Sequence, residues 1–265
     1  MQKIINAHCH IYPESIAERA VKGISDFYGI KIDANGMTSD LIKEGERFNV
    51  VHYLIQSVAT KPSQVKSINE FIASEVRAHP GIFTGFGTLH PDSEDLEGDL
   101  AHLLSLGLKG VKIHPDFQFF SLAEDRAIRL GEMIREAGLP VLTHCGDFRY
   151  KLSNPDQLRV FLDHLPGLTV IGAHLGGWSV WDEVEKKIAG QYDMYVDCSS
   201  CFRFMEKEDA VRLIRKFGTD KVLWGTDYPT WDCGSDLELF DGLGLNEEEK
   251  EKILYSNAAQ LLGLN

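Results

Sequence analysis

The chain has 265 residues, of which 43% are hydrophobic and 10% aromatic, so it has enough apolar material for a core and is not a disordered protein. Its formal net charge of -13 at pH 7 and the lack of a basic run argue against nucleic acid or an anionic membrane surface as a partner. The sequence has no run of 18 apolar residues and no leader pattern, and its five cysteines are an odd number, so we expect a cytoplasmic protein with reduced thiols. We expect it to act on a small molecule, as a monomer or a homo-oligomer.

Short apolar segments alternate with longer helical patterns along the whole chain. The expected strands span residues 2–9, 50–57, 82–89, 108–114, 139–144, 168–174, 194–198 and 221–226. The expected helices span residues 38–48, 62–78, 94–106, 123–137, 155–164, 180–190, 206–217, 247–254 and 257–263. This alternation is typical of an α/β fold, a (β/α)8 TIM barrel, with a doubly wound open sheet as the alternative. We expect one domain over residues 1–265, with a helical insertion at 11–37 over the barrel mouth.

The first expected strand ends in two histidines separated by one residue, in the stretch AHCH. Because side chains alternate along a strand, His8 and His10 point to one face, and Cys9 points to the other. An imidazole buried without a partner loses about 1 to 3 kcal/mol. A divalent metal ion is the partner that we expect here.

Further metal-ligating side chains stand at the carboxyl ends of later strands. They are His90, His114, His144, His174 and Asp227. In a (β/α)8 barrel the active site forms at the face made by these ends, so residues far apart in the sequence meet there. Imidazoles with a carboxylate suit Zn²⁺, Mn²⁺ or Fe²⁺.

Together, the stretches NAHCHIYPE, KGVKIHP, VLTHCG, AHLGG and GTDYP resemble the amidohydrolase superfamily, and within it the amidohydrolase-related branch of metal-dependent hydrolases and decarboxylases. The resemblance implies that His8, His10, His144 and Asp227 hold one divalent metal ion, with zinc expected first and manganese or iron as alternatives. It also implies that His174 acts in catalysis beside the metal, and Asp227 is expected to accept a proton from water.

The fourth strand differs from that of the binuclear members of this superfamily, which resemble one another in a carboxylated lysine or a glutamate that bridges two metals. Here the strand offers Lys112 and His114. We therefore expect one metal, with His114 in contact with substrate, and a second-metal role for His114 as the alternative. Arg149 and Arg203, in loops after later strands, are expected to bind a substrate carboxylate, although either could be a surface charge.

These patterns predict a metal-dependent hydrolase that uses metal-activated water on a small, carboxylate-bearing substrate. The alternatives are a metal-dependent decarboxylase of a small aromatic or unsaturated acid, a phosphatase, and a noncatalytic barrel that binds a metal or ligand. Cys198 and Cys201 form a C-x-x-C pair, which leaves a dithiol redox site or a structural zinc site as minor alternatives.

Overall fold

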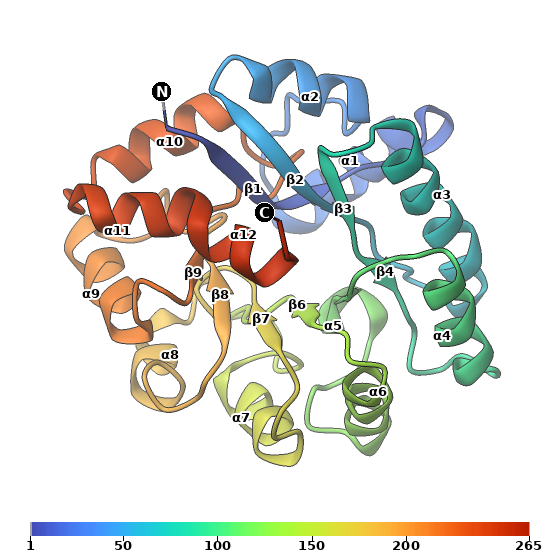
Figure 1. The fold of residues 1–265 in the computed structure, drawn as a ribbon. Helices are drawn as coiled ribbons and strands as arrows, with labels where there is room; N and C mark the ends of the chain where they lie inside the picture. The colour runs from blue at the N-terminus through green and yellow to red at the C-terminus, as the bar shows by residue number, and fades with distance from the viewer. Residues whose placement is uncertain (1, 265) are drawn as a thin grey trace.

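Parallel strands close into a barrel at the centre of the computed structural model, which describes residues 2–264 (Figure 1). The expected third strand is divided into two labelled segments, β3 and β4, so nine labels cover the barrel strands of the described residues. The strands are β1 (Ile4–His10), β2 (Val50–Gln56), β3 (Phe83–Gly85), β4 (Gly87–Thr88), β5 (Val111–Ile113), β6 (Val141–Thr143), β7 (Val170–Gly172), β8 (Tyr195–Asp197) and β9 (Val222–Leu223).

Backbone contacts, three of which are described below, join the two sheets, β1-β2-β3 and β4-β5-β6-β7-β8-β9, into one closed barrel. Between β3 and β4 the chain changes partner, because the Phe86 N–H donates to the carbonyl of Ile55 on β2, at 3.0 Å. On the other side, the Ala7 N–H of β1 donates to the carbonyl of Trp224, next to β9, at 2.9 Å. The third contact is a parallel bridge between Cys9 and Tyr228. The predicted (β/α)8 fold is therefore confirmed.

Helices form a ring around the strands in Figure 1. They are α1 (Glu14–Tyr28), α2 (Thr38–Glu46), α3 (Val65–Ala78), α4 (Leu96–Ser105), α5 (Pro115–Gln118), α6 (Asp125–Glu136), α7 (Pro155–His164), α8 (Trp181–Lys187), α9 (Lys207–Phe217), α10 (Cys233–Asp241), α11 (Glu247–Glu251) and α12 (Asn257–Leu262), with a 3₁₀ turn η1 (Pro62–Gln64) and a π-helix η2 (Lys252–Ser256). Apolar side chains at helical spacing bury one face of each longer helix, as Ala210, Leu213 and Phe217 do in α9. None of the helices in residues 2–264 is both long and apolar enough to cross a bilayer.

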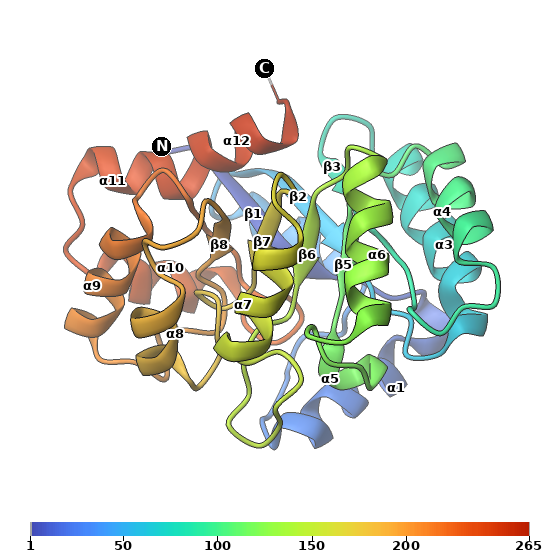
Figure 2. The ribbon, with the colours of Figure 1, turned by 90° about the horizontal axis from the view of Figure 1, so that it is seen from below.

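The two ends of the barrel are closed differently. At the amino ends of the strands, Ala258 and Ala259 of α12 pack against side chains inside the barrel, including Ile5, Leu54 and Leu142. Figure 2 shows α12 and the two termini on this side, and α1 and α5 on the opposite side, where the strands end. The carboxyl ends of the strands therefore remain available for a site, beneath α1.

A bulge in β1 turns its last residues into the barrel. The register with β2 is irregular between Asn6 and Cys9, where β1 has one residue more than β2. Before the bulge, Ala7 packs inside the barrel, and after it Cys9 packs in the outer core between strands and helices. An extra residue shifts the alternation of side chains by one position, and as a result His8 and His10 point to the barrel mouth.

Candidate active site

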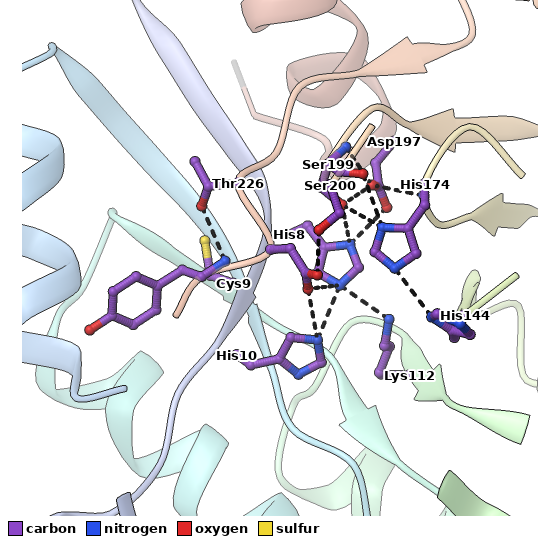
Figure 3. Close-up of polar contacts among 12 residues, drawn as sticks. His8, Cys9, His10, Lys112, His144, His174, Asp197, Ser199, Ser200 and Thr226 are labelled. Atoms are coloured by element: carbon purple, nitrogen blue, oxygen red, sulfur yellow. Dashed lines mark hydrogen bonds and ion pairs between the residues drawn. The ribbon is translucent and has the colours of Figure 1, made fainter. Parts of the chain in front are cut away.

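Three of the predicted metal ligands gather at the barrel mouth, and Figure 3 shows two of them, His8 and His10, next to each other. One ligand atom from each of His8, His10 and Asp227 lies within 4.8 Å of the other two. The Nε2 atoms of His8 and His10 are 3.1 Å apart, and Asp227 Oδ1 lies 3.3 Å from His8 Nε2 and 3.6 Å from His10 Nε2. Two strands at opposite ends of the sequence therefore build one cluster of nitrogen and oxygen atoms.

The tautomer of His8 is fixed by Asp197, the last residue of β8. His8 Nδ1 lies 2.8 Å from Asp197 Oδ2, and both side chains are fully buried. Because an ionised carboxylate only accepts hydrogen bonds, Nδ1 carries the proton and Nε2 presents a lone pair to the cluster. Burial and the nearby Lys112 hold the pKa of His8 well below its usual value, so this ring is neutral at pH 7.

Asp227 is oriented by a neighbouring hydroxyl. Ser200 Oγ donates to Asp227 Oδ2 at 2.8 Å and accepts from the Trp231 indole N–H at 2.9 Å. This holds Oδ1 toward the histidines, while burial raises the pKa of Asp227 to about 7. A nearby cation would therefore stabilise the ionised form of this carboxyl group.

His144 and His174 form a second pair beside this cluster. His144 Nε2 donates to the carbonyl of Gly146 at 2.8 Å, and His174 Nδ1 donates to the carbonyl of Ser199 at 3.0 Å. Each neutral ring then has its lone pair on the other nitrogen, and these two nitrogens, His144 Nδ1 and His174 Nε2, face each other at 3.2 Å. Burial lowers the pKa of His174 to about 3, so this ring holds no second proton. Two lone pairs in contact need a cation or a proton between them.

The predicted ligand set is therefore only partly brought together. His144 lies beside His174 and outside the group formed by His8, His10 and Asp227, within the residues that the structure describes. Even so, lone pairs of three imidazoles, those of His8, His144 and His174, lie in one buried region with the His10 ring and the Asp227 carboxyl group. The donor atoms are those that Zn²⁺, Mn²⁺ and Fe²⁺ prefer, so the residues fit a divalent metal ion.

Two of these residues have a strained backbone. His174 and Asp227 have φ values of 59° and 57°, in the left-handed region that non-glycine residues rarely adopt. Each such residue costs of order 1–3 kcal/mol, and such residues are concentrated at functional sites. Both residues belong to the candidate site, so the positive φ values coincide with it.

Lys112 is the cation of the site. Its Nζ lies 3.2 Å from His8 Nε2, and its side chain is almost completely buried. Burial lowers the pKa of this ammonium group to about 8. The sequence pattern marks Lys112 as facing the same side as His114, yet it gives no sign that the lysine reaches the first strand, because that contact depends on the barrel closing.

His114 stacks on its neighbours. Its ring lies 3.9 Å from the ring of His144 and 3.9 Å from that of Phe117, and both pairs are nearly parallel. Its Nε2 lies 3.2 Å from the hydroxyl of Tyr28, at the end of α1. His114 thus connects the expected ligand His144 with the helix over the barrel mouth.

The two arginines bind acidic side chains of the protein. Arg149 forms an ion pair with Asp147 at 2.7 Å and donates to the carbonyl of Phe27, while Arg203 forms an ion pair with Asp236 at 2.9 Å. Neither is among the described residues that line the cavity at the histidines. Their predicted role in substrate binding has no direct geometric counterpart, and it stays a prediction.

The C-x-x-C pair lacks the features of a reactive dithiol. Cys198 and Cys201 are buried free thiols, and burial raises the pKa of both. A redox cysteine needs a lowered pKa and access to solvent. Among residues 2–264, the groups of side chains that could hold a metal include neither cysteine.

A cavity of about 530 Å³ opens above the histidines. His8, His10, Lys112 and Asp227 line its inner end, and side chains of α1 and α3, most of them apolar, line the walls beyond, together with Gln64 of η1. A largely apolar cavity with a few polar groups that meet at one end is typical of a site for a small molecule.

Comparison with protein families places residues 5–264 within the model of a family described as Amidohydrolase. Comparison with curated proteins finds no significant match. Solved structures with the same fold include 5-carboxyvanillate decarboxylase from Sphingomonas paucimobilis, at 13% sequence identity and a TM-score of 0.75 over 100% of both chains.

Two further structures have similar scores. A candidate 2-pyrone-4,6-dicarboxylic acid hydrolase from Pseudomonas putida is 19% identical, with a TM-score of 0.71 over 99% of this chain and 98% of that one. A dihydroxybenzoic acid decarboxylase from Polaromonas sp. JS666, solved with bound manganese and the inhibitor 2-nitroresorcinol, is 15% identical, with a TM-score of 0.73 over 100% and 98% of the two chains. At these identities the similarity establishes the fold.

Proposed function

The chain belongs to the amidohydrolase family, whose model it matches over residues 5–264, and on this basis we propose that it is a metal-dependent hydrolase of a small organic acid. The observation that carries the proposal is the meeting of His8 Nε2, His10 Nε2 and Asp227 Oδ1 at the barrel mouth. We propose that these residues and His144 hold one divalent ion, Zn²⁺ or Mn²⁺. Manganese is bound in the similar dihydroxybenzoic acid decarboxylase.

A divalent ion, when bound, supplies Lewis-acid chemistry that activates water and polarises a carbonyl or carboxylate. The protein supplies the proton transfer. His174 is neutral, and Ser199 holds its Nδ1–H, so Nε2 is the atom that accepts a proton from attacking water. Asp227, which Ser200 orients, accepts or returns a proton on the other side of the cluster.

Lys112 is the group that we propose for binding the substrate carboxylate. It lines the cavity directly, and among the described residues its Nζ is within hydrogen-bond distance of His8 Nε2, at 3.2 Å. When the His8 lone pair is used by a metal ion, the buried ammonium needs another acceptor, because a buried donor without a partner is costly. A substrate carboxylate is such an acceptor. His114, Arg149 and Arg203 remain predicted binding residues at the edges of the site.

Decarboxylation is the second candidate reaction. The cavity is largely apolar, and loss of solvent around a carboxylate favours the release of CO₂. Two of the three similar structures named above are decarboxylases of aromatic acids. In this reaction His174 Nε2, which holds no proton in this structure, would first accept one from water and then deliver it to the carbon that loses CO₂.

One experiment distinguishes the two reactions. The purified protein, loaded with Zn²⁺ or with Mn²⁺, is incubated in ¹⁸O-labelled water with panels of aromatic and unsaturated acids, lactones and amides. Incorporation of ¹⁸O into the organic product supports hydrolysis, and release of CO₂ with an organic product that contains no ¹⁸O supports decarboxylation. Tight binding of metal with neither reaction across the panels would favour the noncatalytic alternative.

A further inference from the structure

The cavity continues beyond the histidines into an apolar arm between α1 and α3. On α1, the residues that line it recur at spacings of four, three and four, which puts them on one stripe of the helix: Ile16, Ala20, Gly23 and Phe27. On the other wall stand Ile68 and Phe71 of α3. This stripe lies beside the face that α1 buries in the protein through Ala17 and Val21. Part of the apolar surface of α1 is thus turned to the cavity and not to the core.

Gly23 occupies the middle of this stripe. Glycine weakens the interior of a helix relative to alanine, so its presence in α1 calls for a reason. A Cβ atom added at Gly23 would meet no described atom within 4 Å, so close packing against the protein is not that reason. The lack of a side chain at Gly23 leaves open space along the arm.

The volume of the cavity exceeds the needs of a single small ring. A cavity of about 150 Å³ is enough to hold benzene, and this one measures about 530 Å³. His8 and Lys112 lie at its inner end, and the walls beyond them are mainly apolar, with Arg19, Thr60, Gln64 and Ser67 as polar members. A ligand that fills the cavity would therefore have a polar end at the histidines and a mainly apolar surface along the walls that α1 and α3 provide.

We infer that the substrate is an amphipathic carboxylic acid, whose polar end reaches the histidines and whose apolar extension lies in the arm between α1 and α3. This inference rests on the proposed function, because it names the class of acid on which the same site acts. The nearest chemical description is an aromatic or unsaturated acid with an alkyl substituent of several carbons. Burial of each methylene in the arm strengthens binding, and the walls of the arm include Gly23 and Phe71.

The test is a series of unreactive acids of increasing length. Benzoate, 4-ethylbenzoate, 4-butylbenzoate and 4-hexylbenzoate are titrated into the metal-loaded protein by calorimetry. We expect the affinity to rise by about fourfold for each buried methylene. An affinity that does not change along the series in the wild-type protein would overturn the inference.

Gly23→Leu narrows the arm and leaves the histidines untouched. It should weaken the binding of 4-hexylbenzoate by about 15-fold, the loss expected when two methylenes are displaced, and leave that of benzoate within about twofold. Lys22→Leu adds the same side chain on the exposed side of α1 and should leave the whole series unchanged. Equal losses for both ligands in Gly23→Leu would contradict an apolar arm.

The two proposals fail in different ways. If the affinity rises with length while no metal binds and no acid reacts, the proposed function is wrong and the ligand class stands. If short acids react in a metal-dependent way and length has no effect, the inference about the arm is wrong and the proposed function stands.

Discussion

The carboxylate of Asp197 controls which nitrogen of His8 faces the cluster. In Asp197→Asn, the amide can present its NH₂ group to His8 Nδ1, 2.8 Å from the present carboxylate oxygen. His8 Nδ1 would then have to accept, and its proton would move to Nε2, where it would point at the metal position. Loss of an outer partner of this kind typically weakens metal binding by 10- to 100-fold, or about 1.4 to 2.7 kcal/mol.

The assay is a competition titration of the metal-free protein against a chelator of known affinity, with Mn²⁺ and with Zn²⁺. Asp182→Asn, in the first turn of the surface helix α8, is the matched control and should bind metal as the wild type does. Circular dichroism reports whether Asp197→Asn is folded, since Asp197 Oδ1 also accepts from the backbone N–H groups of His174 and Ser199. A folded Asp197→Asn protein with unchanged metal affinity would refute the assigned tautomer.

Three further outcomes are expected. His174→Asn should keep its metal content but lose at least about 100-fold in turnover, as removal of a general acid or base does; near-normal rates would remove His174 from the mechanism. Because burial raises the pKa of Asp227 to about 7, a metal ion must displace the proton of this carboxyl group at lower pH. The metal affinity of the wild type should therefore rise by about tenfold per pH unit between pH 5.5 and 6.5, whereas Asp227→Asn should bind metal weakly and without this slope. A flat wild-type profile would contradict the assignment. Gly225→Ala should lower the free energy of unfolding by about 1–3 kcal/mol in denaturant titrations, since its Cβ would lie 2.8 Å from that of His8; unchanged stability would mean that β1 can shift.

The positions of the site residues along the chain could be predicted because they depend on local patterns. His8 and His10 are one residue apart on a strand, and His144, His174 and Asp227 follow apolar runs, so a barrel brings all of them to one end. The bulge in β1 could not be predicted, although it determines that His8 and His10 face inward. It depends on the pairing of β1 with β2, which the sequence of β1 alone does not reveal.

The partners of the site residues were mostly missed. Asp197, Ser199 and Ser200 lie in the stretch VDCSS, which at the sequence level suggested only a pair of cysteines. Their roles arise from hydrogen bonds to residues more than 20 positions away, such as that between Ser200 and Asp227. An acid at the end of a strand was the available signal, because acids at that position of a barrel face the mouth.

The two arginines show that a residue type which suits a substrate can also pair within the protein. Arg149 and Arg203 were chosen because guanidinium groups bind carboxylates, and they do bind carboxylates, those of Asp147 and Asp236. Sequence alone cannot distinguish an arginine that binds a substrate from one that pairs within the protein. The single domain over residues 1–265 and the insertion at 11–37 stay predictions, although α1, which lies in that insertion, lines the cavity.

The most direct test is a crystal structure of the protein soaked with Mn²⁺, with anomalous diffraction used to locate the ion. We expect one peak that contacts His8 Nε2, His10 Nε2 and a carboxylate oxygen of Asp227, with His144 moved to complete the set. A protein without any peak, or with its peak only at the neighbouring group of His114, Asp116 and His144, would contradict the account.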